Sequence, residues 1–202
     1  MDPARVKPLR TGPLRRTRRP HVLGIDDGPF RKHVGGSAPV AGVMTEGADL
    51  VEAVALTRFP VDGDDATGFL AGWVGGLRCW EGLQAVVLGG ITLAGLGVVE
   101  IAPLAERLGL PVLVVNRRDP ADHRLEQALR AAGLEARLGA VARTPPARPL
   151  APGLFVSWAG AAEARVAELV GATRRKSALP EPLRLAHLIA RAVATGESRG
   201  RP

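Results

Sequence analysis

Two short, wholly apolar stretches separated by a helix-length segment constrain the fold of this chain most strongly. Ala-Val-Val-Leu (85–88) and Pro-Val-Leu-Val-Val (111–115) have the length and composition of buried strands, and a short helix is expected near 101–108. Continuous apolar strands alternating with helices indicate parallel pairing in a sheet covered on both faces. A length of 202 residues suits one such domain with a substantial core.

Three strand-like runs precede this unit. The first lies within 21–27 and ends in two acids, and the next two lie near 39–44 and 50–59, separated by a hairpin turn at 46–49. These runs predict an antiparallel meander, in which the first strand can neighbour the third. The period then changes to 3.6 residues over 66–77, which predicts a helix with Asp64 or Asp65 as its N-cap.

The rest of the chain predicts further helices and at most two strands. Helices are expected near 121–132, 160–170 and 181–195. The strands are expected within 134–157, interrupted by a proline-rich loop at 144–152. A meander joined to parallel βαβ units is the ribonuclease H-like α/β arrangement, and we expect it to occupy residues 21–202 as a single domain.

The net charge of +7 is concentrated in the first twenty residues. This segment holds seven of the 27 Lys and Arg residues and one acid, whereas the other 182 residues hold 20 basic and 19 acidic groups. Residues 1–20 are therefore expected to form a flexible basic arm, which would attract phosphate backbones through counterion release. A solubilising tail in an arginine-rich chain is an equal alternative.

Composition excludes several classes of protein. No apolar run is long enough to span a bilayer, and the basic, proline-rich start lacks the apolar region of a signal peptide. The single cysteine, Cys79, permits neither an intrachain disulfide nor a thiolate zinc cluster, which suggests a cytoplasmic protein. With no tyrosine and 3% aromatic residues, base stacking is not expected to dominate any binding of single strands.

Acidic residues follow two of the expected strands. Asp26 and Asp27 end the first strand, and Asp62, Asp64 and Asp65 follow the third. If these ends meet at one edge of the sheet, their carboxylates could hold a divalent cation that activates water against a phosphodiester. Solvated turns and helix capping are the alternatives, and spacing alone favours them.

Other residues carry weaker signals. The segment Gly89–Gly95 follows a buried strand and could cradle a phosphate, although it matches no established phosphate-binding motif and a tight turn explains it better. The four histidines show no metal-ligand spacing. A surface or packing role is the default for His187, which lies within the last expected helix.

Five stretches together resemble a known family. They are GIDDGPF (24–30), VALTRFPVDGDDAT (54–67), VVLGGITLAG (86–95), GLPVLVVNRR (109–118) and LPEPLRLAHLIARAVATGESRGR (179–201). The chain resembles the domain of unknown function 99 family, also called UPF0215 or endonuclease dU, which is similar to endonuclease V. This resemblance implies a ribonuclease H-like fold and cleavage of DNA near deaminated bases, with Mg²⁺ or Mn²⁺ as cofactor and deoxyuridine preferred to deoxyinosine.

The resemblance also implies roles for particular residues. Asp26 matches the metal ligand that ends the first strand, and one of Asp62, Asp64 or Asp65 stands near a second acid of the family. Arg117 replaces a lysine of endonuclease V and would hold phosphate, and His187 falls where a helical histidine or acid lies near the metal.

One departure leaves a rival hypothesis open. Endonuclease V has an Asp-Gly pair where this chain has Gly89-Gly90, so one metal-binding carboxylate is missing. Asp27 or the acids at 62–65 would have to replace it; otherwise the protein only binds nucleic acid. A third hypothesis is an enzyme acting on small phosphorylated metabolites, with 89–95 as the anion site. The duplex-opening wedge of endonuclease V is not recognisable, unless Arg58-Phe59-Pro60 takes its place.

Overall fold

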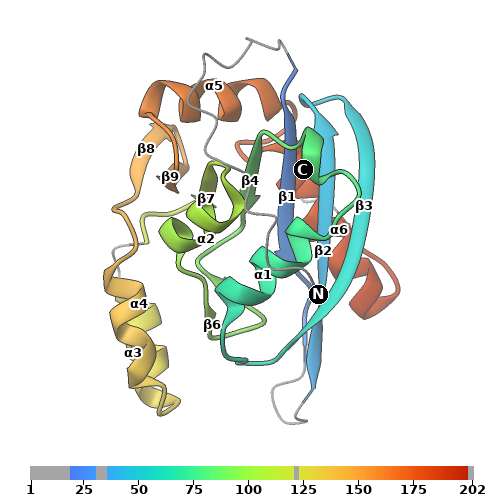
Figure 1. Cartoon of the computed structure of the whole chain (residues 1–202). Helices are drawn as coiled ribbons and strands as arrows, with labels where there is room; N and C mark the ends of the chain where they lie inside the picture. The colour runs from blue at the N-terminus through green and yellow to red at the C-terminus, as the bar shows by residue number, and fades with distance from the viewer. Residues whose placement is uncertain (1–18, 31–35, 121–122, 200–202) are drawn as a thin grey trace.

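A seven-stranded sheet with the strand order β3-β2-β1-β4-β7-β9-β8 forms the centre of the protein (Figure 1). This computed structural model describes residues 19–30, 36–120 and 123–199. Strands β1, β4 and β7 are parallel to one another, and the remaining pairs are antiparallel. The strands are β1 (His21–Asp27), β2 (Ser37–Glu46), β3 (Leu50–Pro60), β4 (Ala85–Leu88), β7 (Val112–Asn116), β8 (Arg148–Ala151) and β9 (Leu154–Ala159).

Helices cover both faces of this sheet. The first core cluster joins one face to α1 and α2, and the second joins the other face to α5 and α6. A small hairpin of β5 (Thr92–Leu93) and β6 (Gly97–Val98) lies outside the main sheet. The helices are α1 (Ala66–Gly75), α2 (Ile101–Leu108), α3 (Arg124–Ala131), α4 (Leu138–Ala142), α5 (Glu163–Thr173) and α6 (Glu181–Thr195), with the 3₁₀ turns η1 (Trp80–Gly82) and η2 (Glu135–Arg137).

The alternation of side chains along β1 decides where its two terminal acids point. Leu23 and Ile25 belong to the core cluster beneath α1 and α2, whereas Val22 belongs to the cluster beneath α5 and α6. Successive side chains of a strand point to opposite faces. Asp26 therefore faces α6, and Asp27 faces the side of α1 and the β5–β6 hairpin.

Gly24 in β1 and Gly28 directly after it allow α6 to lie against the strand. A Cβ atom at Gly24 would lie 2.2 Å from the backbone nitrogen of Leu183, and one at Gly28 would lie 2.3 Å from the carbonyl oxygen of Ala190. Any other residue at these positions would push the helix away, because backbone atoms cannot yield as a flexible side chain can. The close contact fixes the position of His187, which lies between those two contact points on α6.

The predicted meander joined to parallel strands is confirmed, including the hairpin at 46–49. The first and third strands, which could have been neighbours, are separated by β2. Residues 135–142, where a strand was possible, are helical. The proline-rich stretch instead supplies β8, an edge strand, where the missing N–H of Pro149 is tolerated.

Two expectations concern the chain ends and membranes. Most of the expected basic arm, residues 1–18, lies outside the described residues. Among the described helices, none combines the length and the apolar character needed to cross a membrane.

Candidate functional site

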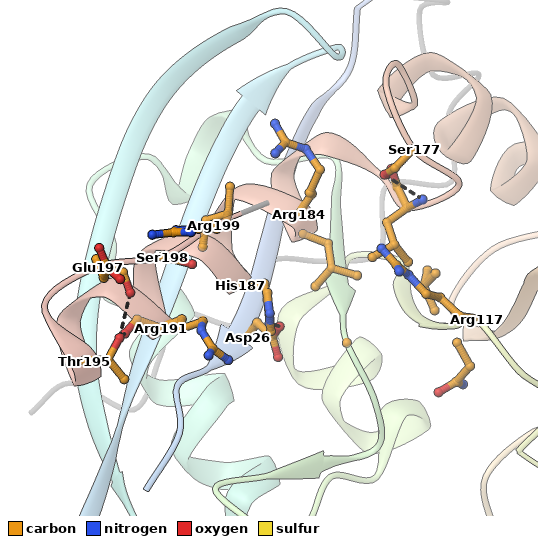
Figure 2. Close-up of a pocket in the computed structure, with 16 residues that line it drawn as sticks. Asp26, Arg117, Ser177, Arg184, His187, Arg191, Thr195, Glu197, Ser198 and Arg199 are labelled. Carbon is orange, nitrogen blue, oxygen red and sulfur yellow. Dashed lines mark hydrogen bonds and ion pairs between the residues drawn. The ribbon is translucent and has the colours of Figure 1, made fainter. Parts of the chain in front are cut away.

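An open cleft of about 910 Å³ lies at the carboxyl ends of the parallel strands, with α6 forming one wall (Figure 2). Asp26 comes from the end of β1, Gly89 follows β4, and Arg117 follows β7. Ligand sites of α/β sheets favour this edge, where loops after several strands converge. The wall formed by α6 and the residues after it contributes Leu183, Arg184, His187, Leu188, Arg191, Thr195, Glu197, Ser198 and Arg199.

Asp26 and His187 point toward each other in this cleft, and the Nδ1 atom of His187 lies 2.8 Å from the Oδ2 atom of Asp26 (Figure 2). This hydrogen bond to the Asp26 carboxylate raises the pKa of His187, against burial and the positive charges of Arg191 and Arg117, which lower it. The Asp26 side chain is 21% exposed and the imidazole is 56% exposed. The pair therefore remains accessible to a molecule in the cleft.

Asp27 follows Asp26 in β1, and the pKa of its carboxyl group is strongly raised. Burial, followed by repulsion from the Asp26 carboxylate, raises the pKa of Asp27 to about 6, although backbone hydrogen bonds at Ala94 and at its own N–H oppose the shift. Its backbone N–H donates to Oδ1 of Asp26 at 3.0 Å. Burial beside a second carboxylate disfavours the charged form of Asp27, so a bound proton or a nearby cation stabilises this place.

Three cleft arginines are free to meet an anion. Arg117, Arg191 and Arg199 form no ion pair with any other residue in the described ranges, whereas Arg184 is held by two hydrogen bonds to the buried Glu181. Guanidinium groups suit phosphate because they are planar and always charged. The cleft thus combines an acidic floor with cationic walls.

The structure does not bring the acids after β3 into this cleft. Oδ1 of Asp62 accepts from the backbone N–H of Leu96 at 2.8 Å, and Asp64 pairs with Arg137 at 2.5 Å. Asp65 accepts from the N–H of Gly68 at 2.9 Å and is the N-cap of α1, as one of the two capping alternatives predicted. None of these acids lines the cleft.

Gly89 lies directly against Asp26. A Cβ atom built at Gly89 would lie 3.0 Å from Oδ1 of Asp26. The chain after Gly89 leads first into the β5–β6 hairpin rather than into a helix, and the Leu96 N–H in that hairpin is already used by Asp62. The glycine segment therefore packs as a tight connection beside the acids.

Several other sequence signals lie away from the cleft. Phe59 is 2% exposed and packs on Phe69 with ring centroids 4.8 Å apart, so its ring does not project as a wedge. His21 pairs with Glu52 at the opposite end of β1, and His33 lies outside the described residues. Within the described ranges, His21, Glu46 and Glu52 form the single group of three potential ligands whose atoms lie within 4.8 Å of one another.

Sequence reasoning missed Arg191, Arg199 and Arg137. A signal for the first was available, because positions 184, 187, 188 and 191 share one face of a helix. Arg137 gave no local signal: it donates to the carbonyl oxygens of Leu96 and Asp62 from a turn 75 residues after Asp62. Only the folded chain brings these segments together.

Comparison with known proteins agrees with this geometry. The fold is ribonuclease H-like: a solved structure of Ciona intestinalis endonuclease V, in complex with DNA containing an inosine, matches with a TM-score of 0.50 and 15% identity over 83% of this chain and 82% of that one. A family model described as endonuclease dU matches residues 18–194. The chain belongs to the endonuclease dU family.

Individual relatives cover nearly the whole chain. A UPF0215 protein of Methanothermobacter thermautotrophicus is 38% identical over 89% of this chain and 90% of its own length. One of Deinococcus radiodurans is 38% identical over 89% and 92%. A crystal structure of a protein of unknown function from Archaeoglobus fulgidus matches with a TM-score of 0.78 and 31% identity over 86% and 98%. Family and fold together support a nuclease.

Proposed function

We propose that the protein is a metal-dependent endonuclease that cleaves DNA at or near deaminated bases, with deoxyuridine preferred to deoxyinosine, and that it acts in DNA repair. The observation that carries this proposal is the Asp26–His187 pair on the floor of an arginine-walled cleft. The family's description names an endonuclease dU, and the structurally similar Ciona enzyme was solved with inosine-containing DNA.

The acidic floor fits a hard divalent cation with few protein ligands. Mg²⁺ commonly binds through one or two carboxylates and retains several waters or substrate phosphates. Asp26 and Asp27, which both line a small hollow beside Gly89, would hold Mg²⁺ or Mn²⁺. The pKa of Asp27 is raised first by burial and then by the Asp26 carboxylate, and a nearby cation would offset both effects. When bound, the ion would supply charge neutralisation and an activated water for attack on phosphorus.

The remaining cleft residues would position the substrate. Arg117 and Arg191 would bind the phosphates on either side of the scissile bond, because both are cations that line the cleft and form no ion pair within the described ranges. His187 would orient the Asp26 carboxylate through its Nδ1 atom. A cleft open to solvent suits a strand with its target base exposed, and damaged base pairs are the easiest to open.

A non-catalytic nucleic-acid-binding protein is the second candidate, and Gly89 is the observation that favours it. Gly89 lies against Asp26. The resemblance to endonuclease V implies a carboxylate at this position, so the floor of this cleft would have one acid fewer. The roles of Asp62, Asp64 and Asp65 as metal ligands would require each to leave its present partner. An enzyme that acts on small phosphorylated metabolites is less well supported. The cleft is open, and the glycine segment packs as a tight connection beside the acids.

Cleavage assays separate the two candidates. Duplex and single-stranded DNA containing uracil, hypoxanthine or no lesion would be incubated with the full chain and Mg²⁺, Mn²⁺ or EDTA. A nuclease nicks the uracil strand only with metal. A protein that binds every lesion substrate but nicks none of them with either metal is a binder.

A further inference from the structure

A second group of potential metal ligands lies at the amino end of β1, away from the cleft. His21 begins this strand, and Asp26 lies five residues further on, which separates the two positions by about 17 Å along an extended strand. The group consists of His21, Glu46 and Glu52, whose potential ligand atoms all lie within 4.8 Å of one another. Three neighbouring strands therefore contribute one ligand each, at the hairpin end of β2 and β3 (Figure 1).

Regular strand pairing brings His21 and Glu46 together. The two residues are direct partners in the antiparallel pair β1–β2, so their side chains lie side by side on one face of the sheet. Leu23 and Met44, two residues away along the same strands, belong to the core cluster beneath α1 and α2. Because side chains alternate along a strand, His21 and Glu46 lie on this same face.

A β-bulge adds Glu52 to this pair. The register of β2 with β3 shifts after Met44, and Glu52 is the extra residue that has no partner on β2. Ala53, the next residue, packs on the core beneath α1, so strict alternation would turn Glu52 to the opposite face. The bulge turns it back, since Oε2 of Glu52 lies 2.9 Å from Nε2 of His21. Bulges re-aim side chains in this way beside functional sites.

The group has an excess of negative charge. Glu52 pairs with His21, and Glu46 forms no ion pair within the part of the chain that the structure describes. Even a protonated imidazole leaves one carboxylate uncompensated, whereas a divalent cation bound to the neutral imidazole neutralises both. The side chains of His21 and Glu52 are 35% and 38% exposed, so an ion and its water ligands can reach them.

We propose that His21, Glu46 and Glu52 bind one Zn²⁺ ion, with water completing its coordination. Zinc takes imidazole nitrogen and carboxylate oxygen at about 2.1 Å, which places tetrahedral ligands about 3.4 Å apart. Ligand atoms that already lie within 4.8 Å of one another reach this spacing through small side-chain rotations. Imidazole favours Zn²⁺ over Mg²⁺, and the usual affinity order places Zn²⁺ above Mn²⁺, so this site differs in chemistry from the acid pair of the cleft. The bound ion joins β1 to the β2–β3 hairpin.

Zinc binding by an untagged full chain that carries Asp26→Asn tests this site apart from the cleft. Calorimetric titration of this parent chain with Zn²⁺ should show one equivalent bound. Adding Glu46→Gln removes a ligand that forms no ion pair and should weaken binding by at least about tenfold. Glu52→Gln should weaken binding to a similar extent. Asp49→Asn changes an exposed acid of the same hairpin that pairs with Arg175, and as the control it should leave zinc binding unchanged.

Melting curves separate loss of the ligand from loss of the fold. Zn²⁺ should raise the melting temperature of the parent chain, and neither Glu46→Gln nor Glu52→Gln should show that rise. Both variants should melt like their parent in EDTA, because an amide keeps the shape of the carboxylate it replaces. A parent chain that binds no Zn²⁺, or whose zinc affinity is unchanged by either substitution, overturns the proposal. Neither result bears on the proposed nuclease, which is tested by Mg²⁺-dependent cleavage.

Discussion

The Nδ1 atom of His187 lies 2.8 Å from Oδ2 of Asp26, which links the last helix to the end of the first strand across 161 residues of sequence. Gly24 and Gly28 make this contact possible because their lack of side chains lets α6 lie on β1. The candidate site therefore depends on packing between the two ends of the fold.

Divalent cations should stabilise the protein through Asp26. We expect Mg²⁺ or Mn²⁺ to raise the melting temperature of the wild-type chain, because the cation neutralises adjacent carboxylates. Asp26→Asn should abolish that increase. Asp49→Asn, which removes an exposed acid paired with Arg175, is the matched control and should keep it. An equal metal response in wild type and Asp26→Asn would exclude a metal at this place.

Asp27 should make the metal-free protein less stable as pH rises. Its pKa is about 6 in the folded protein against 3.8 for an ordinary aspartate, so the folded state binds this proton more tightly than the unfolded chain. The contribution of Asp27 to the free energy of unfolding should therefore fall between about pH 4 and pH 6 and stay at its lower value above that range. The loss from this one group is at most about 3 kcal/mol.

The substitution Asp27→Asn tests this sign. In EDTA, the variant should be more stable than wild type near pH 8 and should gain little or nothing near pH 4, where Asp27 is half protonated even in the unfolded chain. Urea unfolding at the two pH values gives both differences. A variant that is less stable by the same amount at both pH values would show that the Asp27 carboxylate is not penalised by burial.

The acids that follow β3 should stabilise the folded protein and not bind the metal. Asp65→Ala is expected to lower the free energy of unfolding by about 1 kcal/mol, because it removes the N-cap of α1. Asp64→Ala removes a surface ion pair and should change stability by less than about 1 kcal/mol. Both variants should retain any DNA cleavage below their melting transitions. Loss of cleavage at unchanged stability would instead assign them to the metal site.

Salt dependence should separate the contributions of the cleft and the basic arm to DNA binding. Arg191→Gln is expected to weaken binding to all sequences alike and to reduce the slope of log affinity against log salt by about one phosphate contact. Arg143→Gln, whose arginine pairs with Glu100 away from the cleft, is the control and should leave the slope unchanged. Deleting residues 1–18 should flatten the slope further, and an unchanged slope would mean that the arm makes no phosphate contacts.

Much of the fold could be predicted from sequence, because local patterns determine it. The apolar strand 85–88 and the helix 181–195, with proline in its first turn and Gly196 after it, have the predicted bounds in the structure. The suggestion that the first strand could neighbour the third did not follow from a meander, in which consecutive strands pair, and β2 indeed lies between β1 and β3. Residues 135–142 lack a strong period, and there helical structure replaced the expected strand.

The candidate site was only partly predictable for the same reason. Asp26 could be selected because it ends a strand, and His187 because of the family resemblance. The spacing of the acids at 62–65 could not distinguish ligands from caps, since both need a carboxylate in a turn after a strand. The structure provides each of these acids with a partner outside the cleft, and such partners depend on distant segments such as the hairpin at Leu96 and the turn at Arg137.

The proposed nuclease activity is tested by strand cleavage of uracil-containing duplex DNA by the wild-type chain and by Asp26→Ala, each measured with Mg²⁺ and with EDTA. The proposed function predicts nicking near the uracil by wild type with Mg²⁺, and no nicking with EDTA or by Asp26→Ala, while that variant still binds the DNA. Backbone binding relies on the arginines, whereas cleavage requires the metal ligand. Wild-type protein that binds this duplex without nicking it, or Asp26→Ala that nicks it as fast as wild type, would contradict the proposed nuclease activity.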